Sequence, residues 1–156
     1  MALQKTIPLG QDEKEKMEQI WNSNFILKNM GVKIDLSDDY LIKAVLDPVL
    51  PMHRGGLGTA AVNGVVLSAL FDLTIGLVGI VNSRNHRTGT VQLNINFLRP
   101  VWGNSLTVEG RLVKQGKSLV FARGEIFDEK KELCATCDGI CSIDFNKPEV
   151  EGFVAI

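Results

Sequence analysis

Residues 64–81 read GVVLSALFDLTIGLVGIV, and Asp72 is the only charged residue in this stretch. As a helix the stretch is nearly long enough to cross a bilayer, but a carboxylate near its midpoint would be costly in lipid. A helix that is apolar on all sides can instead lie at the centre of a soluble domain. We therefore expect a buried core helix and no membrane span.

The sequence after this helix changes to a two-residue period. In residues 90–98, Val91, Leu93, Ile95 and Phe97 alternate with polar residues, which is typical of a half-buried strand. Three further strands are predicted at residues 105–114, 118–127 and 133–143, joined by turns at 115–117 and 128–132. Consecutive hairpins of this kind indicate an antiparallel sheet.

The sequence before the core helix adds one helix and two short strands. An amphipathic helix is predicted at residues 11–28, with an apolar stripe of Met17, Ile20, Trp21 and Phe25, and Gly31 ends it. Strands follow at residues 32–36 and 40–46. The order predicts an α+β fold in which an antiparallel β-sheet wraps around the long central apolar helix. We expect one domain over residues 1–156, with an N-terminal helical segment (1–31) and a short C-terminal tail (144–156).

The composition narrows the class of protein. The 156 residues include 17 basic and 18 acidic side chains, a formal net charge of −1, which argues against a protein that binds nucleic acid. Three cysteines form no complete disulfide framework, so we expect a reducing compartment, the cytoplasm, and we see no signal peptide. Cys134, Cys137 and Cys141 are expected to fill a buried strand as small apolar residues rather than to bind metal.

Asp72 is the strongest candidate for chemistry. Its neighbours in the sequence include Leu70, Phe71, Leu73 and Ile75, and a carboxylate in apolar surroundings is costly unless it is paired, hydrogen-bonded or functional. Ionisable groups in such settings are concentrated at functional sites. The alternative is a structural acid that faces a polar neighbour or a subunit interface.

The start of the core helix is the second candidate. Asn63 is a suitable N-cap, and Gly64 exposes a backbone N–H that can receive an oxygen becoming negative. Gly64 and Asp72 are eight residues apart, about 12 Å along one helix. One reacting carbonyl cannot touch both within a single chain, so a joint role predicts a homo-oligomer with its site at the subunit interface.

The loop before the helix holds two further candidates. His53 could donate a hydrogen bond to a substrate and Arg54 could meet a phosphate, or both could be ordinary solvated loop residues. The loop glycines match neither a P-loop nor a dinucleotide-binding motif.

His86, just past the helix, is expected to be structural, and two histidines without ligand spacing do not support a zinc site. Residues 82–131 hold nine basic side chains, among them Arg99, Lys117 and Arg123, and four acidic ones. The positive potential of this segment would suit an anionic ligand.

The pattern resembles the hotdog-fold acyl-CoA thioesterases, especially the phenylacetate-degradation type. The residues that carry the resemblance are NGVVLSALFD at 63–72 and TVQLNINFLRP at 90–100, and it covers residues 25–143. The resemblance implies dimers or dimers of dimers (a homotetramer) that bind acyl-CoA at the subunit interface. It also implies Asp72 as the catalytic base or nucleophile, Gly64 as the backbone donor to the thioester carbonyl, and Thr90 as a hydroxyl that orients water. No cofactor is expected, because CoA is part of the substrate.

The sequence departs from that family at two places. Asn63-Gly64-Val65 stands where His-Gly-Gly is common, and the loop that contains His53 is longer. Three functions therefore remain in view: hydrolysis of an acyl-CoA thioester, non-catalytic binding of acyl-CoA, and dehydration of a hydroxyacyl thioester. Dehydration is the least favoured, because Ala69 lies where that branch would place an acid.

Overall fold

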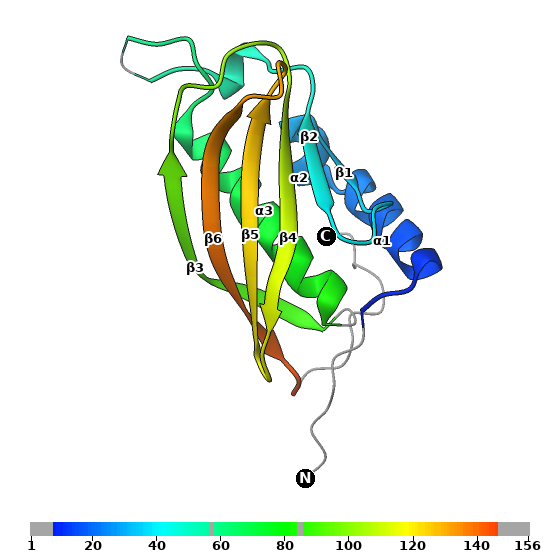
Figure 1. Ribbon diagram of the computed structural model, residues 1–156. Coiled ribbons are helices and arrows are strands. Elements are labelled where there is room, and N and C mark those ends of the chain that lie inside the picture. Colours follow the sequence, from blue (N-terminus) through cyan, green and yellow to red (C-terminus); the bar gives the residue numbers. More distant parts are fainter. Residues whose placement is uncertain (1–7, 57, 84–85, 147–156) are drawn as a thin grey trace.

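One antiparallel sheet wraps around one long helix in the computed structural model, which describes residues 8–56, 58–83 and 86–146 (Figure 1). The six strands have the order β1-β2-β4-β5-β6-β3. The elements are α1 (Gln11–Ser23), α2 (Phe25–Met30), β1 (Val32–Asp35), β2 (Ile42–Leu46), η1 (Pro51–His53), α3 (Gly64–Asn82), β3 (Arg87–Phe97), β4 (Leu106–Gln115), β5 (Leu119–Asp128) and β6 (Leu133–Asp144). The predicted α+β fold is confirmed, and each predicted strand lies within three residues of an observed one. The predicted tail falls largely on residues 147–156, outside the described residues.

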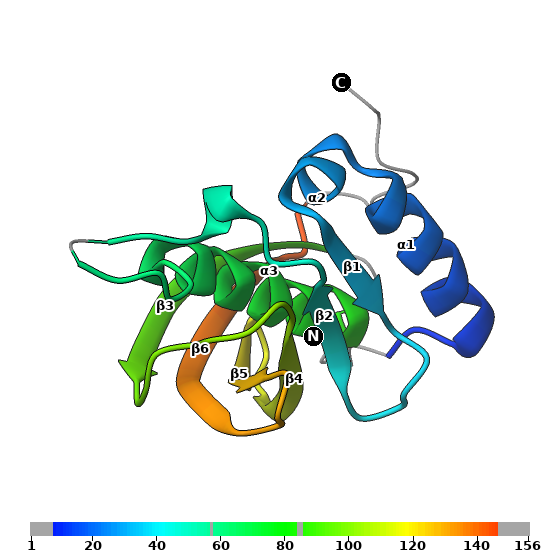
Figure 2. The ribbon, with the colours of Figure 1, turned by 90° about the horizontal axis from the view of Figure 1, so that it is seen from above.

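The sheet approaches α3 closely because glycines face the helix. A Cβ at Gly139 would lie 2.7 Å from Cγ2 of Ile75, and one at Gly124 would lie 2.9 Å from Cδ1 of Phe71. Phe71 and Ile75 are fully buried as a result. Among the described residues α3 is the one helix long and apolar enough to cross a membrane, yet half of it is buried inside the protein. This burial identifies α3 as the predicted core helix (Figure 2).

The N-terminal helix is broken, and the prediction of one continuous helix over residues 11–28 was wrong. Asn24 has extended backbone angles, and its side chain accepts a hydrogen bond from the Ile26 N–H at 2.9 Å, so it caps a second helix, α2. The predicted apolar stripe is only partly buried: Met17 is in the core, whereas Phe25 is 75% exposed. The break turns α2 away from the axis of α1. Gly31 ends α2 in the left-handed conformation, as predicted.

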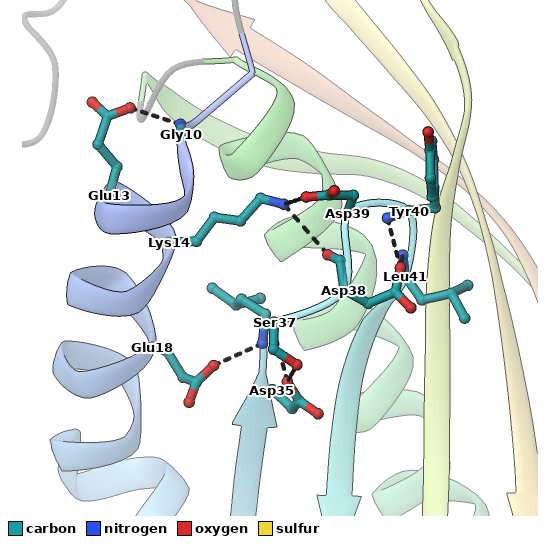
Figure 3. Close-up of polar contacts among 11 residues, drawn as sticks. Gly10, Glu13, Lys14, Glu18, Asp35, Ser37, Asp38, Asp39, Tyr40 and Leu41 are labelled. Atoms are coloured by element: carbon teal, nitrogen blue, oxygen red, sulfur yellow. Dashed lines mark hydrogen bonds and ion pairs between the residues drawn. The ribbon is translucent and has the colours of Figure 1, made fainter.

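Polar side chains of α1 fix it to the β1–β2 hairpin (Figure 3). The buried Lys14 ammonium donates to a carboxylate oxygen of Asp39 at 3.2 Å and to the Asp38 carbonyl at 3.3 Å. Glu18 accepts a hydrogen bond from the Leu36 N–H at 2.8 Å. These bonds connect the N-terminal helices to the sheet edge formed by β1 (Figure 2).

The three cysteines lie on β6 and are buried, as predicted for small apolar residues. Burial raises the pKa of Cys137 and of Cys141 to about 11. Both thiols are therefore protonated near neutral pH, which makes them poor nucleophiles.

Candidate active site

Asp72 lies on α3 and opens toward solvent rather than toward the core. Leu70, Phe71 and Ile75, its neighbours in the sequence, are fully buried against the sheet, but Asp72 itself is exposed. The expectation that apolar neighbours surround this carboxylate was wrong for a single chain, because residues adjacent in a helix point to different faces. Asp72 instead lines a pocket of about 530 Å³ between α2 and α3.

Thr90 lines the same pocket from β3, and a β-bulge is the reason. Thr90 pairs with Cys141 and Gln92 pairs with Ile140, so Val91 is an extra residue between two ladder positions. Without the bulge, Thr90 would share the outer face with Gln92. The predicted alternation placed Val91 with Leu93, but Val91 is 61% exposed. The bulge thus places the Thr90 side chain on the face that carries α3.

The buried Cys141 thiol lies close to both α3 and Thr90. Its Sγ lies 3.5 Å from the Ile75 carbonyl of α3, and it stands opposite Thr90 across the sheet ladder. Burial is the main cause of its raised pKa, a hydrogen bond with the Thr90 side chain opposes the rise, and the Asp72 charge adds to it. Asp72 and Thr90 therefore both influence this buried thiol, and both line the same pocket.

The N-terminal end of α3 holds the other candidates. The Asn63 side chain accepts a hydrogen bond from the Val65 N–H at 2.8 Å and donates one to the Gly55 carbonyl at 2.8 Å. The Gly64 N–H occupies the first helical position, where no intrahelical partner exists, and it donates no hydrogen bond to any described residue. Gly64 is exposed beside the ring of Phe97.

His53 and Arg54 support the loop before α3. His53 is buried, its carbonyl accepts from the Asn63 N–H at 2.9 Å, and its Nδ1 accepts from the Leu50 N–H at 2.9 Å. Its Nε2 is buried without a hydrogen-bond partner among the described residues. The Arg54 guanidinium donates to the Gly103 carbonyl at 2.6 Å and to the Ala60 carbonyl at 3.3 Å. These contacts give Arg54 a role in holding the loop, and its contact with phosphate stays a prediction.

The structure thus brings the predicted residues together in two groups. Asp72 and Thr90 share the pocket, whereas His53, Arg54, Asn63 and Gly64 gather at the start of α3. The two groups are about 12 Å apart along the helix, as the spacing predicted. Across the described ranges 8–56, 58–83 and 86–146, no group of three or more His, Cys, Asp or Glu side chains is placed to hold a metal ion.

Comparisons with known proteins point to one family. A family model described as the thioesterase superfamily matches residues 60–135, which include both groups of candidates except His53 and Arg54. The chain is 28% identical over 100 residues to the medium/long-chain acyl-CoA thioesterase YigI of Salmonella typhimurium. Residues 60–135 are therefore similar to the thioesterase superfamily. The alignment covers 55% of this chain and 64% of YigI, so the chain spans just under two thirds of that relative.

Solved structures of known proteins share the fold. Thioesterase HI1161 of Haemophilus influenzae superposes with a TM-score of 0.73 at 22% identity, over 92% of this chain and 95% of that one. The PaaI protein of the Escherichia coli phenylacetic acid degradation operon gives a TM-score of 0.71 at 20% identity, over 86% of this chain and 96% of that one. The chain therefore has the hotdog fold that its sequence predicted.

Sequence reasoning missed the wall that α2 provides to the pocket beside Asp72. Ile26, Leu27 and Met30 line it from α2, and Trp21 lines it from the end of α1. The available signal was Asn24, whose preference for helix N-caps marks the start of a new helix. Two of the basic residues expected to face an anionic ligand are paired at the surface, Arg99 with Glu132 at 2.9 Å and Arg123 with Asp138 at 2.8 Å.

Proposed function

We propose that the protein hydrolyses acyl-CoA thioesters to free acids and CoA at sites formed between two copies of the chain. The observation that carries the proposal is the placement of Asp72 and Thr90 in one largely apolar pocket. The Gly64 N–H, about 12 Å away along α3, donates no hydrogen bond to any described residue. A carboxylate, a hydroxyl and an exposed backbone donor are the groups that thioester hydrolysis needs. The similarity to the thioesterase superfamily and the name of the YigI relative support the same chemistry.

The roles follow from the chemistry of each group. The Gly64 N–H of one chain donates to the thioester carbonyl and stabilises the oxyanion as it forms. Asp72 of the other chain takes a proton from water as that water attacks, or attacks the carbonyl itself. The Thr90 hydroxyl orients the water beside Asp72. The thiol of CoA leaves when the tetrahedral intermediate collapses.

The assembly that we propose pairs the open edge of β3 with the same edge of a second chain. β3 is the last strand in the sheet order, and Val91 and Phe97 on it are 61% and 55% exposed. Phe97 also lies against Gly64, so a partner on this edge would reach the start of α3. We further propose that such dimers pair into tetramers and that the protein works in the cytoplasm, where its three free thiols stay reduced.

A panel of acyl-CoAs assayed for free thiol tests the function. Thiol release by the wild type supports hydrolysis, water loss without thiol release would indicate a dehydratase, and binding without turnover would indicate a binding module. In this panel Asp72→Asn should lower kcat by about 10²- to 10⁴-fold, the usual contribution of a general base. Its far-ultraviolet circular dichroism should be unchanged, because Asp72 is exposed. Near-normal hydrolysis by Asp72→Asn would contradict the assignment.

A further inference from the structure

The pocket that holds Asp72 and Thr90 continues along α3 as an apolar channel. Asp72, Leu73, Gly76, Leu77 and Ile80 line it from one face of the helix. Their spacing of three and four residues forms one stripe on the helix surface. From Asp72 to Ile80 the stripe runs for eight residues, about 12 Å.

The opposite wall of the channel comes from the N-terminal helices. Trp21, Ile26, Leu27 and Met30 present apolar side chains to it, and the break at Asn24 carries α2 to this position. Both long walls are mainly apolar, although Asn24 and Thr88 also line the channel, and Asp72 and Thr90 supply the carboxylate and hydroxyl of the reaction. The channel is therefore suited to an unbranched apolar chain whose reactive end is at Asp72.

Gly76 lies in the middle of the stripe with empty space in front of it. A Cβ built at Gly76 would meet no heavy atom within 4 Å. One turn further along α3, a Cβ at Gly79 would lie 3.2 Å from Cβ of Cys141, so close packing accounts for that glycine. Glycine in a helix interior is destabilising relative to alanine, and no such packing accounts for Gly76. The absence of a side chain at Gly76 keeps the channel open at this point.

We infer that this channel binds the acyl chain of the substrate and that Gly76 sets the length of chain that it accepts. An extended chain with carbon–carbon bonds of about 1.5 Å advances roughly 1.25 Å per carbon, so the 12 Å from Asp72 to Ile80 holds on the order of ten carbons. The substrate class is thus unbranched acyl thioesters of medium length. That the ligand is an acyl-CoA rests on the proposed function. The length of chain that the channel accepts rests on the structure of the channel alone.

The test is a chain-length profile of Gly76→Leu against acyl-CoAs from acetyl to dodecanoyl. A leucine at this position fills the channel beyond Asp72, so kcat/KM for decanoyl-CoA should fall about ten- to a hundredfold. The kcat/KM for acetyl-CoA and butanoyl-CoA should change less than about twofold, because short chains end before residue 76. The matched control is Gln19→Leu, which adds the same side chain to an exposed position of α1 outside the channel.

Binding of a non-hydrolysable decyl thioether of CoA, measured by calorimetry, separates this inference from the proposed function. If the wild type hydrolyses nothing but binds the thioether, and Gly76→Leu weakens that binding about tenfold or more, the channel assignment holds and the hydrolysis proposal fails. If Gly76→Leu lowers all chain lengths equally, or changes none, the channel assignment is overturned while hydrolysis stands. Should Gly76→Leu misfold, Gly76→Ala gives the same test, with a severalfold loss expected for decanoyl-CoA and dodecanoyl-CoA and little change for acetyl-CoA and butanoyl-CoA.

Discussion

At the scale of single residues, Thr90 depends on one inserted neighbour for its place in the site. The bulge at Val91 turns the Thr90 side chain toward α3, where it lines the same pocket as Asp72. β-Bulges are frequent beside active sites because they redirect a side chain without breaking the sheet. Thr90 is exposed, so its side chain contributes little to the core and is available to a water molecule.

This position predicts the effect of removing the Thr90 hydroxyl. Thr90→Val keeps the shape of the side chain but loses the hydrogen bond to water, and kcat should fall roughly tenfold, the value of one such bond. Thr90→Ser restores a hydroxyl and should recover most of the loss. Steady-state kinetics on one acyl-CoA, with thermal unfolding as a check on stability, measures both. Equal activity in Thr90→Val and Thr90→Ser would remove the hydroxyl from the mechanism.

At the scale of elements, the N-terminal helices owe their arrangement to the cap at Asn24. The Asn24 side chain satisfies the Ile26 N–H, and its extended backbone separates α1 from α2. Asn24→Ala should lower the free energy of unfolding by about 1 kcal/mol, the usual cost of losing an N-cap. Asn24→Asp keeps an acceptor and should retain most of the stability. Urea denaturation of the three proteins measures this difference, and no loss in Asn24→Ala would show that the cap is dispensable.

Elements with strong periodicity could be predicted from the sequence, and local exceptions could not. The apolar run of α3 and the alternation in β4, β5 and β6 predicted their places to within a residue, because burial against one sheet determines them. The break at Asn24 and the bulge at Val91 interrupt these periods by a single residue. The periodicity of apolar residues is judged over a window of many residues, so an interruption of one residue does not show in it. The identity of Asp72 as a candidate was visible, but the pocket beside it was not, since α2 forms the opposite wall.

At the scale of the whole molecule, the candidate site is divided between two ends of α3. The Gly64 N–H and the Asp72 carboxylate are about 12 Å apart in one chain, and a thioester carbonyl cannot reach both. The open edge of β3, with its exposed Val91 and Phe97, offers the surface on which a second chain could bring its own Asp72 to Gly64. A twofold assembly of this kind contains two identical sites, each with one group from either chain.

Mixing two inactive variants tests this arrangement. Gly64→Pro removes the N–H at the first helical position, where proline is well tolerated, and the extended Asn63 backbone suits a following proline. A Cβ at Gly64 would meet the Phe97 ring at 3.6 Å, an ordinary contact. Gly64→Pro and Asp72→Asn should each be nearly inactive alone. Unfolded and refolded together in equal amounts, half of the dimers should be hybrids with one intact site in two, so about a quarter of the wild-type activity should return. If each site lay within one chain, the mixture would stay as inactive as its parts.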